Sequence, residues 1–381
     1  MNIGFIEDTP LRGGTQIWVT EAAQYFLNKG ENVILLAPEG SWIAEICKQA
    51  GVDVHTYDYD KVVSEDAESK KIWTETLKLC NVAICTVHPP RHGFHCSVFA
   101  GTCIKYAGLK TILMPKSGTI VPDYLRKYYV PHENIPLKVI AITEFTRNYM
   151  LETYKIPAET AELIYQGTEV ELFTPNTDRK KEAFKRYVLP ENAFPVIGCI
   201  GTYEERKGQI VLLESIKDLV NGALPNAHLV LVGEGPDELM LKKNVKKFGL
   251  SDNVSFFEFT HEPVYIFERL DILVLSSLYK EGLPNVILEA MSMNLPVVSS
   301  RLAGVPEVVK NGETGFMVEP GNKDELTEAI VKLCSDVVVL KQIGDNGRRM
   351  MEEKFDKQVQ FEEFLQYFYK ITELTPMGQL G

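Results

Sequence analysis

The sequence predicts an α/β protein with two parallel sheets, each doubly wound by helices. Short apolar strands alternate with helical patterns from the first residues onward, which is typical of a parallel sheet covered on both faces. A polar, charged stretch ends at Pro195, and residues 195–200 begin a second set of strands. A chain of 381 residues with 45% hydrophobic residues is long and apolar enough for two large cores.

The first half contains six apolar runs that predict strands. They cover residues 2–6, 32–38, 52–57, 82–87, 110–115 and 138–142. Ligands of doubly wound sheets bind beyond the carboxyl ends of the strands. The loops after the first, fourth, fifth and sixth of these runs are therefore the candidates for ligand binding.

The loop after the first strand contains Gly13 and Gly14 and leads into a helical pattern over residues 17–27. A strand, a glycine loop and a helix start form a layout that cradles phosphates, because the first N–H groups of the helix are free. The glycine spacing differs from the dinucleotide-binding fingerprint. A tight turn is the alternative interpretation.

The loop after the fourth strand contains His88, His92, His95 and Cys96. Their spacing fits no standard zinc pattern, so we expect no metal site there. His88 directly follows the strand, and we expect it to face donor or acceptor at the ligand-binding edge. An exposed loop is the alternative.

Residues 124–129 are basic and aromatic. They predict either a solvated helix face or, at most, a weak peripheral contact with a membrane surface.

The second half begins with a strand at residues 195–200 and a turn that carries Arg206 and Lys207 before a helical pattern. Two cations beside free N–H groups can hold a diphosphate. An exposed basic pair is the alternative, but a position directly after a buried strand favours the diphosphate site.

The most informative stretch is residues 271–300, which read as strand, turn, helix and strand. Pro284 suits the first helical position, where a missing N–H costs nothing. Glu281 precedes the helix, and Glu289 lies about 7 Å further along its axis than Pro284. Carboxylates accept hydrogen bonds from neighbouring hydroxyls, so each glutamate could hold a sugar or ribose ring. Two solvent-facing glutamates are the alternative.

The composition of the chain disfavours several classes of protein. The net charge of −12 disfavours a nucleic-acid binder, which needs a basic face. No apolar run approaches the roughly 20 residues of a membrane span, and the start of the chain does not resemble a signal peptide. Seven scattered cysteines indicate a reduced compartment. We expect a cytoplasmic protein, free or at the inner face of the membrane.

The run from Glu281 to Glu289, with residues 304–307 and 311–316 behind it, resembles the retaining glycosyltransferases of family 4. Residues 164–175 resemble the passage between the two domains of that family, and residues 228–236 resemble its Gly-x-Gly-Pro turn. The resemblance implies the GT-B fold, in which two Rossmann-like domains face each other across a cleft. Residues 1–165 would form the acceptor-side domain, residues 166–355 the donor domain, and residues 356–381 a helix that packs back on the first domain.

The resemblance also implies an activity. The protein would move a hexose-type sugar, with a uridine diphosphate-sugar favoured, to a hydroxyl of a glycan, lipid-linked or small-molecule acceptor. It would keep the anomeric configuration and need no metal or other cofactor. A GT-B sugar-nucleotide epimerase and a non-catalytic sugar-nucleotide binder are the alternatives.

The residue patterns and the family resemblance together identify candidate site residues. We expect Glu281, Lys207, Arg206 and His88 to act in catalysis. The expected donor-binding residues are Gly13, Gly14, Ser117, Thr202, Gly235, Phe259, Gly282, Leu283, Pro284, Asn285, Val286 and Glu289.

At two places in the expected site, this chain departs from the family pattern. The family usually carries a histidine near the donor sugar where this chain has Lys116, Ser117 and Thr119. His88 or Ser117 would replace that histidine in part. The family also carries an arginine where this chain has Thr202, and Arg206 is the candidate to supply that charge.

Overall fold

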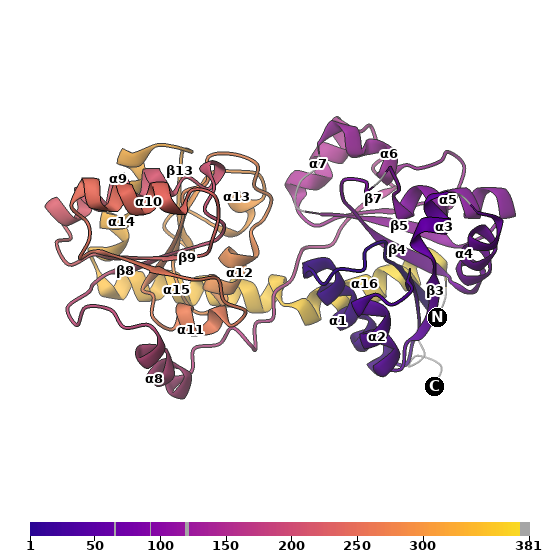
Figure 1. The fold of residues 1–381 in the computed structure, drawn as a ribbon, viewed down its shortest axis with the longest axis horizontal. Coiled ribbons are helices and arrows are strands. Elements are labelled where there is room, and N and C mark those ends of the chain that lie inside the picture. Colours follow the sequence, from indigo (N-terminus) through magenta and orange to yellow (C-terminus); the bar gives the residue numbers. More distant parts are fainter. Residues whose placement is uncertain (65, 92, 119–121, 374–381) are drawn as a thin grey trace. The chain divides into compact units, whose positions relative to one another are not determined.

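The computed structural model describes residues 1–64, 66–91, 93–118 and 122–373, and it divides into two compact units. Unit 1 comprises Met1–Tyr165 and the residues from Gln360 onward, and unit 2 comprises Gln166–Val359. Both are α/β, and the ribbon in Figure 1 shows helices on both faces of each sheet. The predicted pair of doubly wound sheets is confirmed.

The sheet of unit 1 has seven parallel strands in the described residues, in the order β3-β2-β1-β4-β5-β6-β7. Its strands are β1 (Asn2–Ile6), β2 (Asn32–Pro38), β3 (Asp53–Tyr57), β4 (Val82–Val87), β5 (Ile112–Ser117), β6 (Val139–Ala141) and β7 (Ala161–Leu163). The helices are α1 (Gly14–Asn28), α2 (Trp42–Gln49), α3 (Tyr59–Val63), α4 (Ala67–Leu79), α5 (Cys96–Ala107), α6 (Arg126–Tyr129) and α7 (Glu144–Glu152), with a 3₁₀ turn η1 (Asp123–Leu125).

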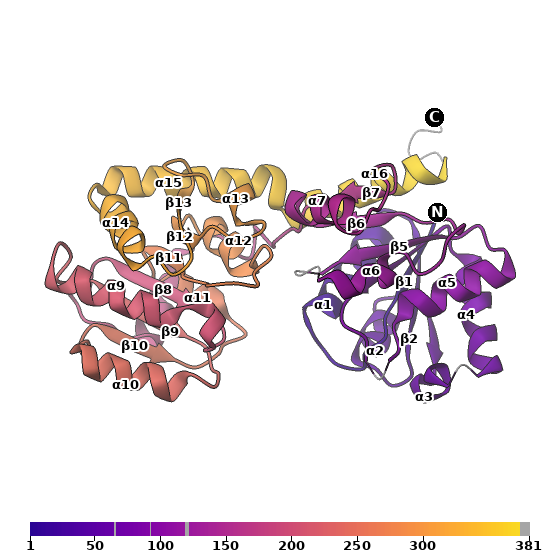
Figure 2. The same cartoon turned by 90° about the horizontal axis from the view of Figure 1, so that it is seen from above.

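Side chains alternate between the two faces of this sheet. Ile3 and Phe5 of β1 point into one core, and Ile6 points into the other. The first core is covered by α1, α2 and the last helix, α16 (Lys357–Thr372). In Figure 2, seen from above, α16 and α1 can be followed along the sheet of unit 1 on which they pack.

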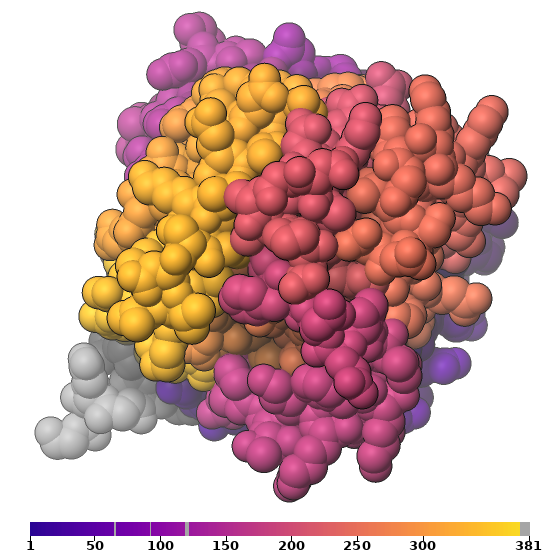
Figure 3. Space-filling model, turned by 90° about the vertical axis from the view of Figure 1, so that its left-hand side faces the viewer, coloured from indigo at the N-terminus to yellow at the C-terminus, as the bar shows by residue number. Residues whose placement is uncertain are grey.

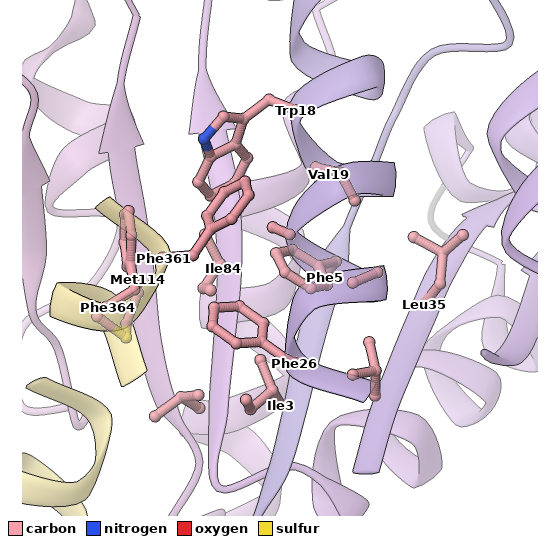
Figure 4. Close-up of a cluster of buried hydrophobic side chains, with 14 of the residues drawn as sticks. Ile3, Phe5, Trp18, Val19, Phe26, Leu35, Ile84, Met114, Phe361 and Phe364 are labelled. Carbon is pink, nitrogen blue, oxygen red and sulfur yellow. The ribbon is translucent and has the colours of Figure 1, made fainter. Parts of the chain in front are cut away.

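The helix α16 contributes an aromatic stripe to the core of unit 1. Phe364 and Phe361 contact the ring of Trp18, with ring centroids 5.5 and 5.9 Å apart (Figure 4). The indole Nε1 of Trp18 donates to Gln360 Oε1 at 2.9 Å. Apolar burial of this kind is worth about 1.5–3 kcal/mol for each large side chain. The stripe therefore fixes α16 to the first unit.

Unit 2 repeats the plan with six parallel strands in its described residues, in the order β10-β9-β8-β11-β12-β13. Its strands are β8 (Val196–Ile200), β9 (His228–Val232), β10 (Val254–Phe257), β11 (Ile272–Leu275), β12 (Val297–Ser300) and β13 (Gly315–Val318). Its helices are α8 (Thr177–Arg186), α9 (Gln209–Asn221), α10 (Glu238–Phe248), α11 (Pro263–Phe267), α12 (Asn285–Ser292), α13 (Val305–Val308), α14 (Lys323–Cys334) and α15 (Val337–Met350), with short turns η2 (Glu205–Lys207) and η3 (Met351–Phe355).

Helices α9, α10 and α14 cover one face of this sheet, and α11, α12 and α15 lie on the other (Figure 1). The space-filling view in Figure 3 shows α14 in yellow, α9 in red and α10 in orange, next to one another on the outer surface of the unit. In each sheet, strand order reverses beside the first strand of the unit. The switch points lie between β1 and β4 and between β8 and β11, which is where doubly wound folds bind ligands.

The interpretation of residues 124–129 as a surface segment was wrong in part. Tyr128 and Tyr129 are buried in a small core with β6 and α7, while Tyr124 is exposed. Arg126 and Lys127 directly precede the two buried tyrosines, so the sequence reads as a polar surface there. No large aromatic face remains there for a membrane surface.

Candidate active site

Two loops meet at the switch point of unit 2. The first follows β8 and includes η2, and the second follows β11 and leads into α12. Leu278 N donates to Arg206 O at 2.7 Å, and Ser276 Oγ donates to Gly208 O at 3.0 Å. These bonds fix the backbone of the two loops against each other.

Gly208 makes this approach possible. Its φ is +64°, in the left-handed region, and it caps the start of α9. A Cβ at this position would lie 2.1 Å from the carbonyl oxygen of Ser276. Only glycine tolerates both conditions, so the sequence places glycine where the two loops must touch.

Glu281 is the centre of the cluster that this backbone creates. Its Oε1 lies 2.6 Å from Lys207 Nζ and 3.3 Å from Arg206 Nη1, and it accepts a bond of 2.8 Å from Ser277 Oγ. The side chain is only 8% exposed. A carboxylate this buried is expensive unless it is paired, and these partners provide the pairing. The structure thus brings three predicted catalytic residues together.

A second carboxylate extends the cluster outward. Glu204 Oε1 accepts from Thr202 Oγ1 at 2.7 Å and contacts Arg206 Nη2 at 2.7 Å. Arg206 therefore bridges Glu204 and Glu281. The positive charges of the two cations equal the negative charges of the two carboxylates. These ion pairs hold the cations in fixed orientations, so an incoming dianion would meet cations that are already positioned.

Residues 282–286 connect Glu281 to α12, but their side chains have different roles. Gly282 and Pro284 are buried, and Leu283 is fully buried, so any contact of Leu283 with a donor would be through its backbone. Asn285 is exposed and accepts a hydrogen bond at Oδ1 from Gln166 Nε2, and Val286 is partly exposed.

Pro284 is the N-cap of α12, with φ −66° and ψ 128°, and Asn285 is the first helical residue. The prediction of Pro284 at the first helical position was one residue early, because the extended ψ of Pro284 delays the first helical turn.

Glu289 lies one helical turn into α12 and is partly buried. Burial raises the pKa of its carboxyl to about 7, the charge of Lys357 opposes this rise, and the charge of Glu169 adds to it. A carboxyl with a pKa near neutrality can change its hydrogen-bonding role with pH.

Two other predicted donor residues lie near the same edge of the sheet. Gly235 follows β9 with φ +158°, and a Cβ there would lie 2.4 Å from the carbonyl oxygen of Tyr203, so packing alone requires glycine. Phe259 follows β10; its side chain is 58% exposed and its ring meets His261 edge-on.

The switch point of unit 1 holds a different cluster. His88 Nε2 contacts Asp8 Oδ1 at 2.8 Å, and His88 Nδ1 lies 2.7 Å from the carbonyl oxygen of Pro89. Burial alone would lower the pKa of His88, but the hydrogen bond and charge of Asp8 outweigh it and raise that pKa. Both ring nitrogens face acceptors, as in an imidazolium that donates twice.

This geometry changes the interpretation of His88. The sequence predicted a histidine that faces donor or acceptor. In the structure both ring nitrogens are used within unit 1, and the ring also lies 4.9 Å from that of His95. His88 holds the Asp8 carboxylate in place, and it has no ring nitrogen left for proton transfer in this arrangement.

The remaining predicted residues of unit 1 lie at the same edge. Gly13 is the N-cap of α1 and Gly14 its first residue, and no side chain of the described residues caps this helix. Ser117 is fully buried at the end of β5, where its Oγ accepts from Ile142 N at 3.1 Å. Lys116 is buried over the ring of Trp18, 4.3 Å from its centroid, and burial lowers its pKa to about 8. Thr119 and His92 lie outside the described residues.

One group of possible metal ligands occurs among the described residues: Asp8, His95 and Cys96, all buried. Each of the three side chains already has a hydrogen-bond partner outside the group. The Asp8 oxygens accept from His88 and from Cys96 N, and contact with Cys85 and burial raise the pKa of the Cys96 thiol well above its usual range. The raised pKa of Cys96 disfavours the thiolate form in which a cysteine binds zinc.

Sequence reasoning missed three residues of these clusters. Ser277 donates to Glu281, Glu204 pairs with Arg206, and Asp8 anchors His88. Asp8 follows β1 within two residues, and a carboxylate just past a switch-point strand is a signal that could have identified it.

The donor-side residues lie within a segment that matches a known family. Residues 180–350 match the model of the glycosyl transferases group 1. This segment contains both loops of the Glu281 cluster and the whole sheet of unit 2. Residues 180–350 are a glycosyl transferases group 1 domain.

Relatives of known name agree with this assignment. The chain is 30% identical over 198 residues to the capsular polysaccharide biosynthesis glycosyltransferase CapM of Staphylococcus aureus, which covers 52% of this chain and 51% of CapM. It is 28% identical over 218 residues to a GDP-mannose-dependent phosphatidylinositol monomannoside mannosyltransferase of Mycolicibacterium smegmatis, over 55% of this chain and 56% of that protein. The chain thus spans about half the length of these relatives.

Solved structures share the fold of nearly the whole chain. The structure of Anabaena Alr3699/HepE in complex with UDP superposes with a TM-score of 0.82 and 18% identity, covering 98% of this chain and 100% of that one. The predicted GT-B fold with two Rossmann-like domains is confirmed. Across the described part of the chain, no helix has both the length and the apolar character needed to cross a bilayer.

Proposed function

We propose that the protein is a retaining hexosyltransferase. It moves a sugar from a uridine diphosphate-sugar to a hydroxyl of a glycan, lipid-linked or small-molecule acceptor, in polysaccharide or glycoconjugate synthesis. The observation that carries the proposal is the partly buried Lys207–Glu281–Arg206 cluster, at the switch point of a glycosyl transferases group 1 domain. The solved relative with UDP bound supports uridine as the base.

The cluster suits the charge that develops during transfer. As the bond between sugar and diphosphate breaks, the sugar gains oxocarbenium character and the diphosphate gains negative charge. Lys207 and Arg206 are fixed cations that stabilise the leaving diphosphate without reorganising. Because these cations would contact the diphosphate directly, the proposal includes no metal ion.

Glu281 acts on the sugar side of the same reaction. Its carboxylate positions the two cations and offers its second oxygen to the sugar. The leaving phosphate takes the proton of the acceptor hydroxyl on the same face of the sugar. This front-face route retains the anomeric configuration and needs no protein nucleophile.

Glu289 holds the ribose hydroxyls as an ionised carboxylate, and this gives a pH-dependent prediction. Its pKa of about 7 means that it is protonated at lower pH and must lose its proton to accept from both hydroxyls. The affinity for UDP-glucose is expected to rise with pH, by up to about tenfold for each pH unit below the Glu289 pKa, and to level off above it. Calorimetric titration between about pH 5.5 and pH 8 measures this affinity. UDP-glucose is the ligand of choice because its diphosphate lacks the second ionisation near pH 6, so the ligand itself does not titrate in this range.

Two variants test the assignment of that titration. Glu289→Gln should remove the pH dependence. Glu169→Gln should move its midpoint to lower pH, since the charge of Glu169 raises the Glu289 pKa. A profile of the unmodified protein that is flat across this range would contradict the ribose role.

Thermal unfolding with a panel of nucleotides tests the proposed function as a whole. Uridine, guanosine and adenosine diphosphate-glucose are compared, with and without magnesium. A ligand at a hundred times its dissociation constant stabilises by about 2.7 kcal/mol, which is easily measured. We expect a shift with the uridine donor that does not depend on magnesium; a shift only with another base, or only with the metal, would contradict the donor assignment.

A further inference from the structure

Unit 1 has a cavity of about 760 Å³, and no residue of the Glu281 cluster lines it. It opens at the carboxyl ends of β1, β2 and β3, beside the switch point, and each strand contributes to its lining. Asp8 comes from the loop after β1, Pro38 from the end of β2 and Tyr57 from the end of β3. Its volume suits a ligand of one or two sugar rings with a short substituent.

One wall of the cavity is apolar. Leu11 lies on its lip with 64% of its side chain exposed, next to Pro10. Tyr57 forms part of the floor and is held in place because its hydroxyl donates to the carbonyl oxygen of Glu7 at 2.7 Å. A large apolar side chain left exposed beside a preformed cavity is covered most simply by an apolar part of a ligand.

The polar lining consists mainly of acceptors. Asp58 uses Oδ1 to cap α3, which leaves Oδ2 for a ligand, and Glu39 is an exposed carboxylate on the neighbouring loop. Carboxylates at a cavity rim accept hydrogen bonds from hydroxyls and repel anions.

The positive charges near the cavity do not outweigh its carboxylates. The charge of Asp8 at the floor is offset by His88. Among the described residues of the lining, Arg91 is the one cationic side chain, and its Nη1 donates to Thr9 Oγ1. Glu39 and Asp58 therefore leave an excess of negative charge at the entrance.

We propose that this cavity binds the acceptor and selects a neutral glycoside with an apolar substituent over an anionic one. The hydroxyls of its sugar donate to Glu39 and Asp58, and its apolar substituent covers Leu11 and Pro10. The proposal rests on the proposed transferase function, and it adds the class of acceptor.

Binding without a donor tests the acceptor class separately from transfer. The probes are hexyl β-glucoside, the matching hexyl β-glucuronide, which replaces one hydroxymethyl group by a carboxylate, and methyl β-glucoside; the corresponding galactosides form a second set. Ligand-observed NMR measures the affinities. We expect the neutral hexyl glycoside of at least one set to bind about fivefold or more tighter than its uronide, and about tenfold tighter than its methyl counterpart.

Two variants connect these differences to the cavity. The double variant Glu39→Gln/Asp58→Asn keeps the cap of α3, since asparagine also caps helices, and should bring the affinities of glycoside and uronide to within about twofold. Leu11→Ser changes an exposed residue and should remove the preference for the hexyl chain. Both variants should unfold at the temperature of the unmodified protein.

Other results of these binding experiments would contradict the proposed acceptor class. Equal or tighter binding of the uronides would show that Arg91 sets the specificity for anions. No binding of any glycoside, in a sample that UDP-glucose still stabilises, would refute the acceptor class and leave the proposed donor site intact. Failure of UDP-glucose itself would refute the proposed function instead.

Discussion

Replacing Glu281 by glutamine is expected to lower the rate of sugar transfer by about a hundredfold or more, because the charge of the carboxylate acts chiefly in the transition state. Glutamine keeps the size of the side chain but cannot hold Lys207 and Arg206 through a charged oxygen. The two cations, released from Glu281, remain available to the diphosphate. Affinity for UDP should therefore stay the same or increase while turnover falls, and steady-state kinetics with calorimetric binding of UDP measures both.

Glu204→Gln is the matched control for this variant. Glu204 also pairs with Arg206, but it lies further out and is 35% exposed. Its loss is expected to change turnover by less than about threefold, as is usual for exposed ion pairs. An unchanged rate in Glu281→Gln would refute the role of Glu281, and a loss of UDP affinity as large as the loss of rate would show that it serves binding alone.

Lys207→Ala is expected to weaken both donor binding and turnover. Hydrogen bonds to charged groups are worth about 1.5–3 kcal/mol, so the affinity for UDP should fall by about ten- to a hundredfold. Turnover should fall further, because the diphosphate gains charge as the bond to the sugar breaks.

The variant also leaves Glu281 buried without its nearest cation, so the unfolding temperature of the free protein should decrease. Lys243→Ala, at an exposed position on α10, is the control for the loss of one positive charge from the same unit. Normal affinity for UDP in Lys207→Ala, in a protein that remains folded, would rule out the diphosphate site.

The sequence was most informative where strand order places a loop at a switch point. Arg206 and Lys207 follow β8, Glu281 follows β11, and the alternation of strands and helices predicts that both loops lie at one edge of a parallel sheet. The direct contact between Lys207 and Glu281 could not be predicted, because it joins residues 74 positions apart and depends on the close approach at Gly208.

Burial explains the predictions that the structure changed. The resemblance marks Leu283, in a loop, and Ser117, at the end of β5, as donor-binding, yet both side chains are fully buried. A sequence pattern shows which loop faces a ligand, but not which side chain of the loop turns back into the core. His88 likewise follows a switch-point strand, and its contact with Asp8 is a tertiary interaction across 80 residues.

The most direct test of the account follows the fate of the sugar. The purified protein is incubated with UDP-glucose labelled with carbon-13 at the anomeric carbon and with the neutral hexyl glycosides, and NMR records the labelled carbon. The account predicts a new α-glycosidic signal that forms in step with free UDP, requires the acceptor, and is reduced by about a hundredfold in Glu281→Gln. A β-linked product would contradict retention. A changed nucleotide-sugar formed without acceptor would show an epimerase, and an unchanged donor that still binds would show a sugar-nucleotide binder without transferase activity.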